Sequence, residues 1–133
     1  MTTKNKVKLP DKQPAIRVAT RPKDTNAAGN IFGGWIMSQV DIAGSIAAVQ
    51  RAKGRVATVA VNSFEFHEPV FVGDLISCYT DIIRVGNTSI TVGVEVYAQR
   101  NPSNPETVRV TQAELTYVAL DENHRPRQVP AEN

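Results

Sequence analysis

The sequence is poor in the residues that build disulfides, zinc sites and catalytic triads. Its 133 residues include one cysteine, Cys78, and two histidines, His67 and His124. One cysteine excludes an intramolecular disulfide, and its neighbours Ser77 and Tyr79 offer no activating base, so we interpret Cys78 as a packing residue. A Ser-His-Asp triad would need His67, which we interpret instead as a charged residue at a strand end.

Common motifs of cofactor chemistry are also absent. The chain contains no G-x-S-x-G, Walker A, G-x-G-x-x-G, C-x-x-C or H-E-x-x-H pattern. Phosphoryl transfer, dinucleotide redox chemistry and zinc hydrolysis therefore lack their usual signals. We expect neither a cofactor nor a metal.

An excess of charge is missing too, since 15 lysines and arginines face 13 aspartates and glutamates. A surplus of two, not gathered in a basic block, does not argue for a nucleic-acid partner.

The first residues, MTTKNKVKLPDKQ, lack the apolar core of a secretory signal, so we expect a cytoplasmic protein. The length leaves room for one domain, and both ends are polar. We place a single domain at 14–120 between tails at 1–13 and 121–133.

Only one long apolar stretch exists, from Ile31 to Val49. Asp41 lies at its centre, where insertion into a bilayer would cost about 2.5–3.5 kcal/mol, so we do not expect a membrane span. We predict a helix that is apolar on every side because protein surrounds it, and that ends at Gly54.

The rest of the domain alternates with the period of β-strands. Val56–Phe66 is apolar on both faces at first, which predicts a central strand. Gly86-Asn87 predicts a tight hairpin turn. We expect the other strands at Ala15–Thr20, Leu75–Val85, Ser89–Ala98 and Val108–Leu120.

In the last of these strands the alternation changes phase around 112–115, which predicts a bulge. The pattern as a whole predicts an α+β fold in which one long helix packs on a curved antiparallel sheet.

Asp41 is the first candidate for chemistry. A carboxylate between Val40 and Ile42 is poorly solvated unless it lines a cleft. Most of its helical neighbours three and four positions away are small, so we expect a recess around it that could admit another chain or a substrate. The alternative is a structural aspartate that caps a loop or pairs with an arginine, and the residues alone leave both readings open.

The second candidate is the loop that precedes the helix. It carries Asn26 and ends in Gly33-Gly34, where a helix start would present free N–H groups and the positive end of its dipole. Without side chains there, a carbonyl oxygen could approach those groups closely; ordinary capping and tight packing also explain the glycines. Together with Asp41, which could activate water or attack directly, this pattern fits acyl transfer from a thioester.

These segments have a family resemblance. The motif D-x-N-x-x-G-x-x-F-G-G-W, with an aspartate seven residues after the second glycine, lies in Asp24–Gly44. It resembles the helix entry of hotdog-fold acyl-CoA thioesterases, in particular the bacterial YciA-type acyl-CoA thioester hydrolases. The likeness continues through Gly54–Asp74 and Arg84–Ala98 and covers roughly residues 14–120.

The resemblance implies a hotdog fold whose chains pair into a dimer with a continuous sheet, commonly within a trimer of dimers. The active sites would lie at the dimer interface, with Asn26 from one chain and Asp41 from the other. Asp41 would be the general base or the nucleophile, and Asn26 would position water or the thioester. The N–H of Gly33 or Gly34 would hold the carbonyl oxygen.

The resemblance also implies a path for the CoA part of the substrate. CoA would run along the strand that begins at Val56, past Thr58 and Val59, and would reach the turn Arg84–Ser89. Arg55 and Arg84 are the candidate phosphate contacts. The remaining turn candidates are Gly86, Asn87, Thr88 and Ser89.

One position departs from many related hotdog enzymes, which carry His-Gly-Gly where this chain has Phe32-Gly33-Gly34. The departure argues against a histidine-dependent dehydratase. Two alternatives to thioester hydrolysis stay open: hydration or dehydration of an enoyl thioester, and a non-catalytic acyl-CoA binding module.

Overall fold

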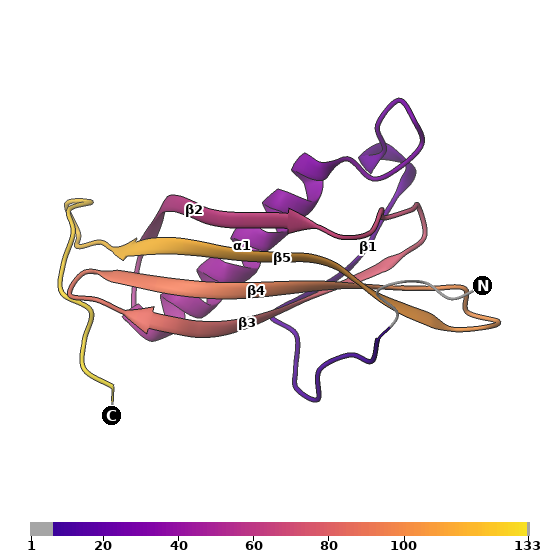
Figure 1. Cartoon of the computed structure of the whole chain (residues 1–133). Coiled ribbons are helices and arrows are strands. Elements are labelled where there is room, and N and C mark those ends of the chain that lie inside the picture. Colours follow the sequence, from indigo (N-terminus) through magenta and orange to yellow (C-terminus); the bar gives the residue numbers. More distant parts are fainter. Residues whose placement is uncertain (1–6, 133) are drawn as a thin grey trace.

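A five-stranded antiparallel sheet lies along one face of a single long helix (Figure 1). This computed structural model describes residues 7–132. The helix is α1 (Gly33–Ala52), and the strand order across the sheet is β1-β3-β4-β5-β2. The expected α+β fold is confirmed. The strands are β1 (Ile16–Ala19), β2 (Val56–Phe66), β3 (Leu75–Val85), β4 (Ser89–Arg100) and β5 (Glu106–Ala119), and a 3-10 turn spans Pro22–Asp24.

The helix begins two residues later than its apolar run predicted and ends close to the predicted stop at Gly54. Ile31 donates its N–H to the Val70 carbonyl at 2.9 Å and Phe32 is an extended N-cap, so the first helical residue is Gly33. At the other end Lys53, with φ of 56°, adopts the left-handed conformation one residue before Gly54. None of the described helices is long and apolar enough to cross a bilayer.

Only one side of α1 is covered by the sheet. Its exposed side carries Met37, Ile42 and Val49, each more than 40% exposed. The prediction of a helix surrounded by protein is therefore wrong for a single chain, because five strands cover one helix face only. The buried face consists of Ile36, Val40, Ala43, Gly44, Ala48 and Ala52.

β2 is an edge strand, which corrects the prediction of a central one. It pairs with β5 on one side only, and register shifts leave Val59 and Asn62 as bulged residues. Val59 and Val61 are 57% and 48% exposed. A long apolar edge with unpaired N–H and C=O groups is a surface that other chains can extend.

The bulge in β5 lies earlier than predicted. The register against β4 shifts between Val96 and Tyr97, which leaves Val110 as the extra residue. Val110 and Thr111 are both buried, so the phase changes there and not at 112–115. A bulged strand can place two consecutive side chains on the same face, so the alternation of apolar and polar residues did not locate the bulge correctly.

The β3–β4 hairpin is confirmed, but its turn is shifted by one residue. Gly86 donates its N–H to the Ser89 carbonyl at 2.8 Å, so the two central residues are Asn87 and Thr88.

The chain after β5 crosses one end of the sheet (yellow in Figure 1). It forms no helix or strand, yet Val129 is buried and donates its N–H to the Asn87 carbonyl. Arg127 Nη2 donates to the Ala52 carbonyl at 2.7 Å, which satisfies a carbonyl at the helix end. The segment expected as a C-terminal tail thus packs on the domain.

Of the expected N-terminal tail, residues 1–6 lie outside the described residues. Lys12 Nζ donates to Asp81 Oδ1 at 2.8 Å and ties the following segment to β3.

Candidate active site

Asp41 lies near the middle of α1, half-buried, on the side that faces β2 and β5. Its Oδ1 accepts a hydrogen bond from Thr58 Oγ1 at 2.7 Å and a second from the Tyr117 hydroxyl at 3.1 Å. Thr58 and Tyr117 are cross-strand partners in the β2–β5 pair. Partners in an antiparallel pair point to the same face, so the sheet register brings both hydroxyls to one carboxylate oxygen.

The surroundings of Asp41 exclude the structural readings that the sequence left open. No arginine or lysine of the described residues pairs with it, and it caps no loop. The described residues place no hydrogen bond on its Oδ2. One oxygen is thus held while the other has bonding capacity left for water or substrate.

The recess predicted next to Asp41 exists at Gly44, but it is not open. The Tyr117 hydroxyl fills it, so close that a methyl group on Gly44 would overlap the hydroxyl oxygen. Substrate therefore cannot enter at this point of the helix.

Asn26 is held by its own loop. Its Oδ1 accepts the N–H of Ala28 at 2.9 Å and the N–H of Asn30 at 3.1 Å. The side chain is exposed, and its amide N–H groups make none of the hydrogen bonds among the described residues. The loop thus presents an amide donor to the surroundings.

Gly33 and Gly34 are the exposed first residues of α1. No side chain caps this helix start, and the first turn has no acidic residue. Free N–H groups at the positive end of a helix dipole favour an oxygen that carries negative charge. The glycines also have a packing reason, since a methyl group on Gly33 would stand 3.3 Å from the Phe66 ring.

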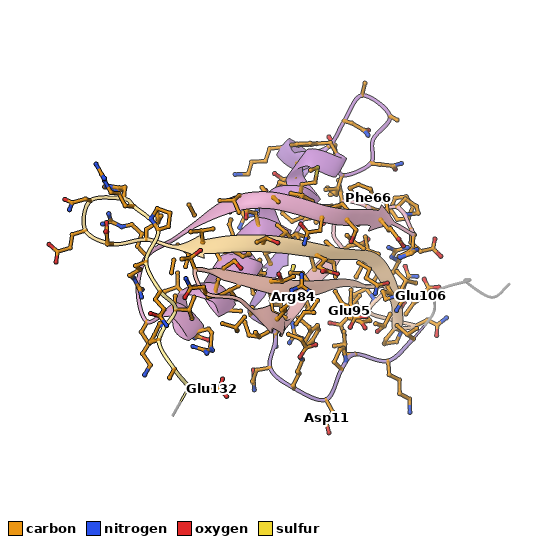
Figure 2. All side chains as sticks on the ribbon, turned by 60° about the vertical axis from the view of Figure 1, so that its left-hand side comes forward. Asp11, Phe66, Arg84, Glu95, Glu106 and Glu132 are labelled. Atoms are coloured by element: carbon orange, nitrogen blue, oxygen red, sulfur yellow. The ribbon has the colours of Figure 1, made fainter. Side chains whose placement is uncertain are left out.

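An apolar cavity of about 370 Å³ opens beside Gly33. Phe66, which lines the cavity, lies at the end of β2, as Figure 2 shows. His67 and Glu68 are its two ionisable lining residues, and the remaining wall is apolar. The apolar wall consists of Ile31, Ile36, Phe66, Pro69, Val70 and Val110.

The predicted CoA contacts gather at the other end of the sheet. Arg55 follows the helix, and its backbone carbonyl accepts a hydrogen bond from the N–H of Leu120. The Nη1 atom of its side chain lies 2.8 Å from His124 Nε2. Thr88 accepts the Ala119 N–H at its carbonyl, and Arg84 Nη2 lies 3.4 Å from Thr91 Oγ1.

The other predicted CoA contacts lie in the β3–β4 hairpin or in the edge strand β2. Gly86 and Asn87 are exposed, Ser89 is half-buried, and Val59 lies in the β2 bulge. Thr58, predicted to contact CoA, is bonded to Asp41.

A single chain keeps these groups apart. α1 has 20 residues, which is about 30 Å at 1.5 Å per residue. Gly33 lies at its start and Arg55 beyond its end, and Asp41 lies eight residues in, roughly 12 Å along the axis. A site that uses all three needs more than one chain or a long substrate.

Sequence reasoning missed Tyr117 and the cavity. Tyr117 shares the buried phase of β5 with Ala113 and Leu115. A tyrosine at such a position needs a partner for its hydroxyl, and a glycine in mid-helix leaves space for one. A tyrosine in the buried phase of a strand, together with Gly44 in the middle of the helix, is the signal that could have identified Tyr117.

Comparison with known proteins gives consistent matches. The model of the Thioesterase superfamily matches residues 28–103. A Haemophilus influenzae protein named uncharacterized acyl-CoA thioester hydrolase is 49% identical over 120 residues, 89% of this chain and 78% of its own. The acyl-CoA thioester hydrolase YciA of Escherichia coli is 42% identical over 126 residues, 93% of this chain and 96% of its own.

Solved structures agree in fold. A hexameric hotdog fold thioesterase of Campylobacter jejuni has a TM-score of 0.86 and 45% identity, with 90% of this chain and 91% of that one covered. An acyl-CoA hydrolase from Staphylococcus aureus, at 28% identity, has a TM-score of 0.78 and covers 86% of this chain and 70% of its own. It was solved as an aspartate-to-alanine and as a threonine-to-alanine mutant, at positions 17 apart. Asp41 and Thr58 are also 17 apart.

Proposed function

The chain belongs to the thioesterase superfamily and has its hotdog fold, and from this premise we propose that it hydrolyses acyl-CoA thioesters at a site that contains Asp41. The observation that carries the proposal is the carboxylate itself. Asp41 is held at Oδ1 by two hydroxyl donors, has no cationic partner among the described residues, and keeps Oδ2 free of bonds from them. Such a carboxylate suits a base or a nucleophile better than a structural contact.

The covalent steps of the reaction use the Asp41 carboxylate and water. As a base, Asp41 takes a proton from water, and the hydroxide attacks the thioester carbon. As a nucleophile, its oxygen attacks that carbon, and water then hydrolyses the anhydride. In both routes the C–S bond breaks, CoA leaves as a thiolate that takes up a proton, and the carboxylic acid is released. A thiol with a pKa of about 8.5 leaves readily, so no histidine acid is required.

We place the thioester carbonyl at the N–H groups of Gly33 and Gly34 of the partner subunit, because the Gly33 of the same chain lies roughly 12 Å from Asp41 along the helix. The uncapped helix start stabilises the oxyanion that forms during attack. From that position the acyl chain would enter the apolar cavity beside Gly33. CoA would extend toward Arg55 and the Arg84–Ser89 turn at the other end of the sheet.

Two chains would complete the site. Antiparallel pairing of β2 with β2 of a second copy satisfies the open edge and covers Val59 and Val61. The second helix then runs in the opposite direction, so Asn26 of the partner subunit would approach Asp41. Because related structures are hexameric, we propose a trimer of such dimers, acting in the cytoplasm.

Replacement of Asp41 tests this proposal. Asp41→Asn keeps an oxygen for the Thr58 and Tyr117 hydroxyls but cannot take a proton or attack. We expect turnover, measured as free CoA released from acetyl- to palmitoyl-CoA, to fall at least ~10²-fold. Asp81→Asn, which neutralises an exposed carboxylate on β3, is the matched control and should keep wild-type turnover.

Wild-type turnover in Asp41→Asn would contradict the mechanism. The alternatives give different products: an enoyl-thioester hydratase adds water to crotonyl-CoA without releasing CoA, and a binding module binds acyl-CoA without either reaction.

A further inference from the structure

Tyr117 carries a polar group into the interface between β5 and α1. Its side chain is fully buried, between β5 and α1. The hydroxyl crosses from the sheet to the helix, 3.0 Å from the Asp41 carbonyl oxygen and 3.1 Å from Asp41 Oδ1. One hydroxyl thus bridges the backbone and the side chain of the same residue.

The helix is shaped to receive this hydroxyl. Gly44, one turn after Asp41, leaves a notch in which the hydroxyl oxygen sits. An added methyl group would overlap that oxygen and would stand 3.0 Å from the ring carbon that bears it. A glycine in the middle of a helix is less favourable than alanine, so the notch comes at the expense of helix stability.

The hydroxyl acts as a donor. Burial, the negative charge of Asp41 and the hydrogen bond to Asp41 all raise the pKa of Tyr117 above its ordinary value. It therefore stays protonated through the pH range in which enzymes work. The hydroxyl has one proton, which it shares between the Asp41 carbonyl oxygen and Oδ1; either acceptor alone would satisfy a buried tyrosine.

We propose that Tyr117 is a positioning residue for Asp41. Seated in the Gly44 notch, its hydroxyl works with Thr58 Oγ1 to fix the carboxylate rotamer, so that Oδ2 is the oxygen offered to water or substrate. This inference rests on the proposed function, because it assigns how Asp41 is oriented for that reaction.

Tyr117→Phe tests the proposal, since it removes one oxygen and keeps the buried ring. We expect kcat for acyl-CoA hydrolysis to fall about tenfold while KM stays within about twofold, because the hydroxyl touches the reacting carboxylate and no part of the substrate. A residue that only supports the fold would lower the amount of folded enzyme and leave kcat per folded site unchanged.

Tyr97→Phe is the matched control. Tyr97 is also a buried tyrosine of the sheet, and its hydroxyl lies 3.4 Å from Glu95 Oε1, away from Asp41. Its kcat should equal that of wild type.

Gly44→Ala is the second variant, for the case that Tyr117→Phe does not fold. Alanine favours the helix, but its methyl group displaces the hydroxyl from the notch. We expect a comparable fall in kcat. Where both single variants fold, their combination should lower kcat by less than the product of the separate effects, because both remove the same contact.

The outcomes separate the two proposals. Unchanged kcat in Tyr117→Phe or in Gly44→Ala, with Asp41→Asn inactive, would overturn the positioning role and leave the proposed function intact. A fall confined to KM would also overturn it. A wild-type protein that releases no CoA from any acyl-CoA would overturn both.

Discussion

At the scale of single residues, burial has different consequences according to the donors it brings. Asp41 is half-buried and receives two hydroxyl donors. Asp74 is almost fully buried, and desolvation raises its pKa although the Phe71 N–H and Arg100 lower it. Cys78 is fully buried, and desolvation raises its pKa to about 12. Of these three groups, Asp41 is the one that is both partly exposed and supplied with hydroxyl donors, so it is the one that can react.

We predict that Cys78 is inert in the folded protein. With a pKa of about 12, roughly one thiol in 10⁴ is ionised at pH 8, and only the thiolate reacts. An aromatic disulfide reagent should label no thiol in the native chain at pH 8 and one per chain in guanidinium chloride. The slow native reaction should speed up as pH rises. Labelling in the native state at the rate of a free thiol would contradict this, and inertness leaves the assay of CoA release without a protein background.

At the scale of the element, β2 and α1 each have one face that a single chain leaves uncovered. The apolar residues on the exposed edge and on the outer helix face lie on elements that follow one another in the chain. Exposed apolar residues on two such elements are typical of an interface between copies.

We predict that a charge on the β2 edge breaks the assembly. Val61→Lys would place an ammonium group in the proposed dimer interface, where it would be desolvated without a partner. Light scattering after size exclusion should show a smaller particle than wild type, with circular dichroism unchanged and turnover lost.

Val7→Lys, on an exposed valine whose N–H bonds to the Thr107 carbonyl at the start of β5, is the control and should assemble normally. A Val61→Lys protein of wild-type mass would show that β2 is not the interface.

At the scale of the whole molecule, the distribution of the site along the helix argues for shared active sites. Asn26 lies before the helix, and Asp41 lies about 12 Å along it. Six chains of 14.5 kDa give a particle of about 87 kDa, which is the expected mass of a trimer of dimers.

Mixed assemblies test the shared site. Asn26→Asp keeps the acceptor that holds its loop but loses the amide donor, and Asp41→Asn loses the carboxylate. Each variant alone should be inactive. Coexpression should restore about a quarter of wild-type activity, since half of randomly formed dimers are mixed and each has one intact site. If both residues served the same site from one chain, the mixture would stay inactive.

Local pattern was sufficient for much of the architecture. The period-two stretches predicted β2 and β3 with their observed bounds, and an acid inside an apolar helix identified Asp41 as unusual. Both signals are carried by neighbours within a few positions, so they survive without knowledge of the fold.

The other features depend on residues that are distant in the chain. β2 has the composition of a central strand but lies at an edge, because strand order is decided by packing between distant parts of the chain. Tyr117 is 76 positions from Asp41, and only the sheet register and the notch at Gly44 bring its hydroxyl to the carboxylate. Local periodicity therefore determined where the helix and strands lie and identified Asp41. Long-range packing decided how Asp41 is held, because only packing brings side chains that are distant in the chain within hydrogen-bond distance.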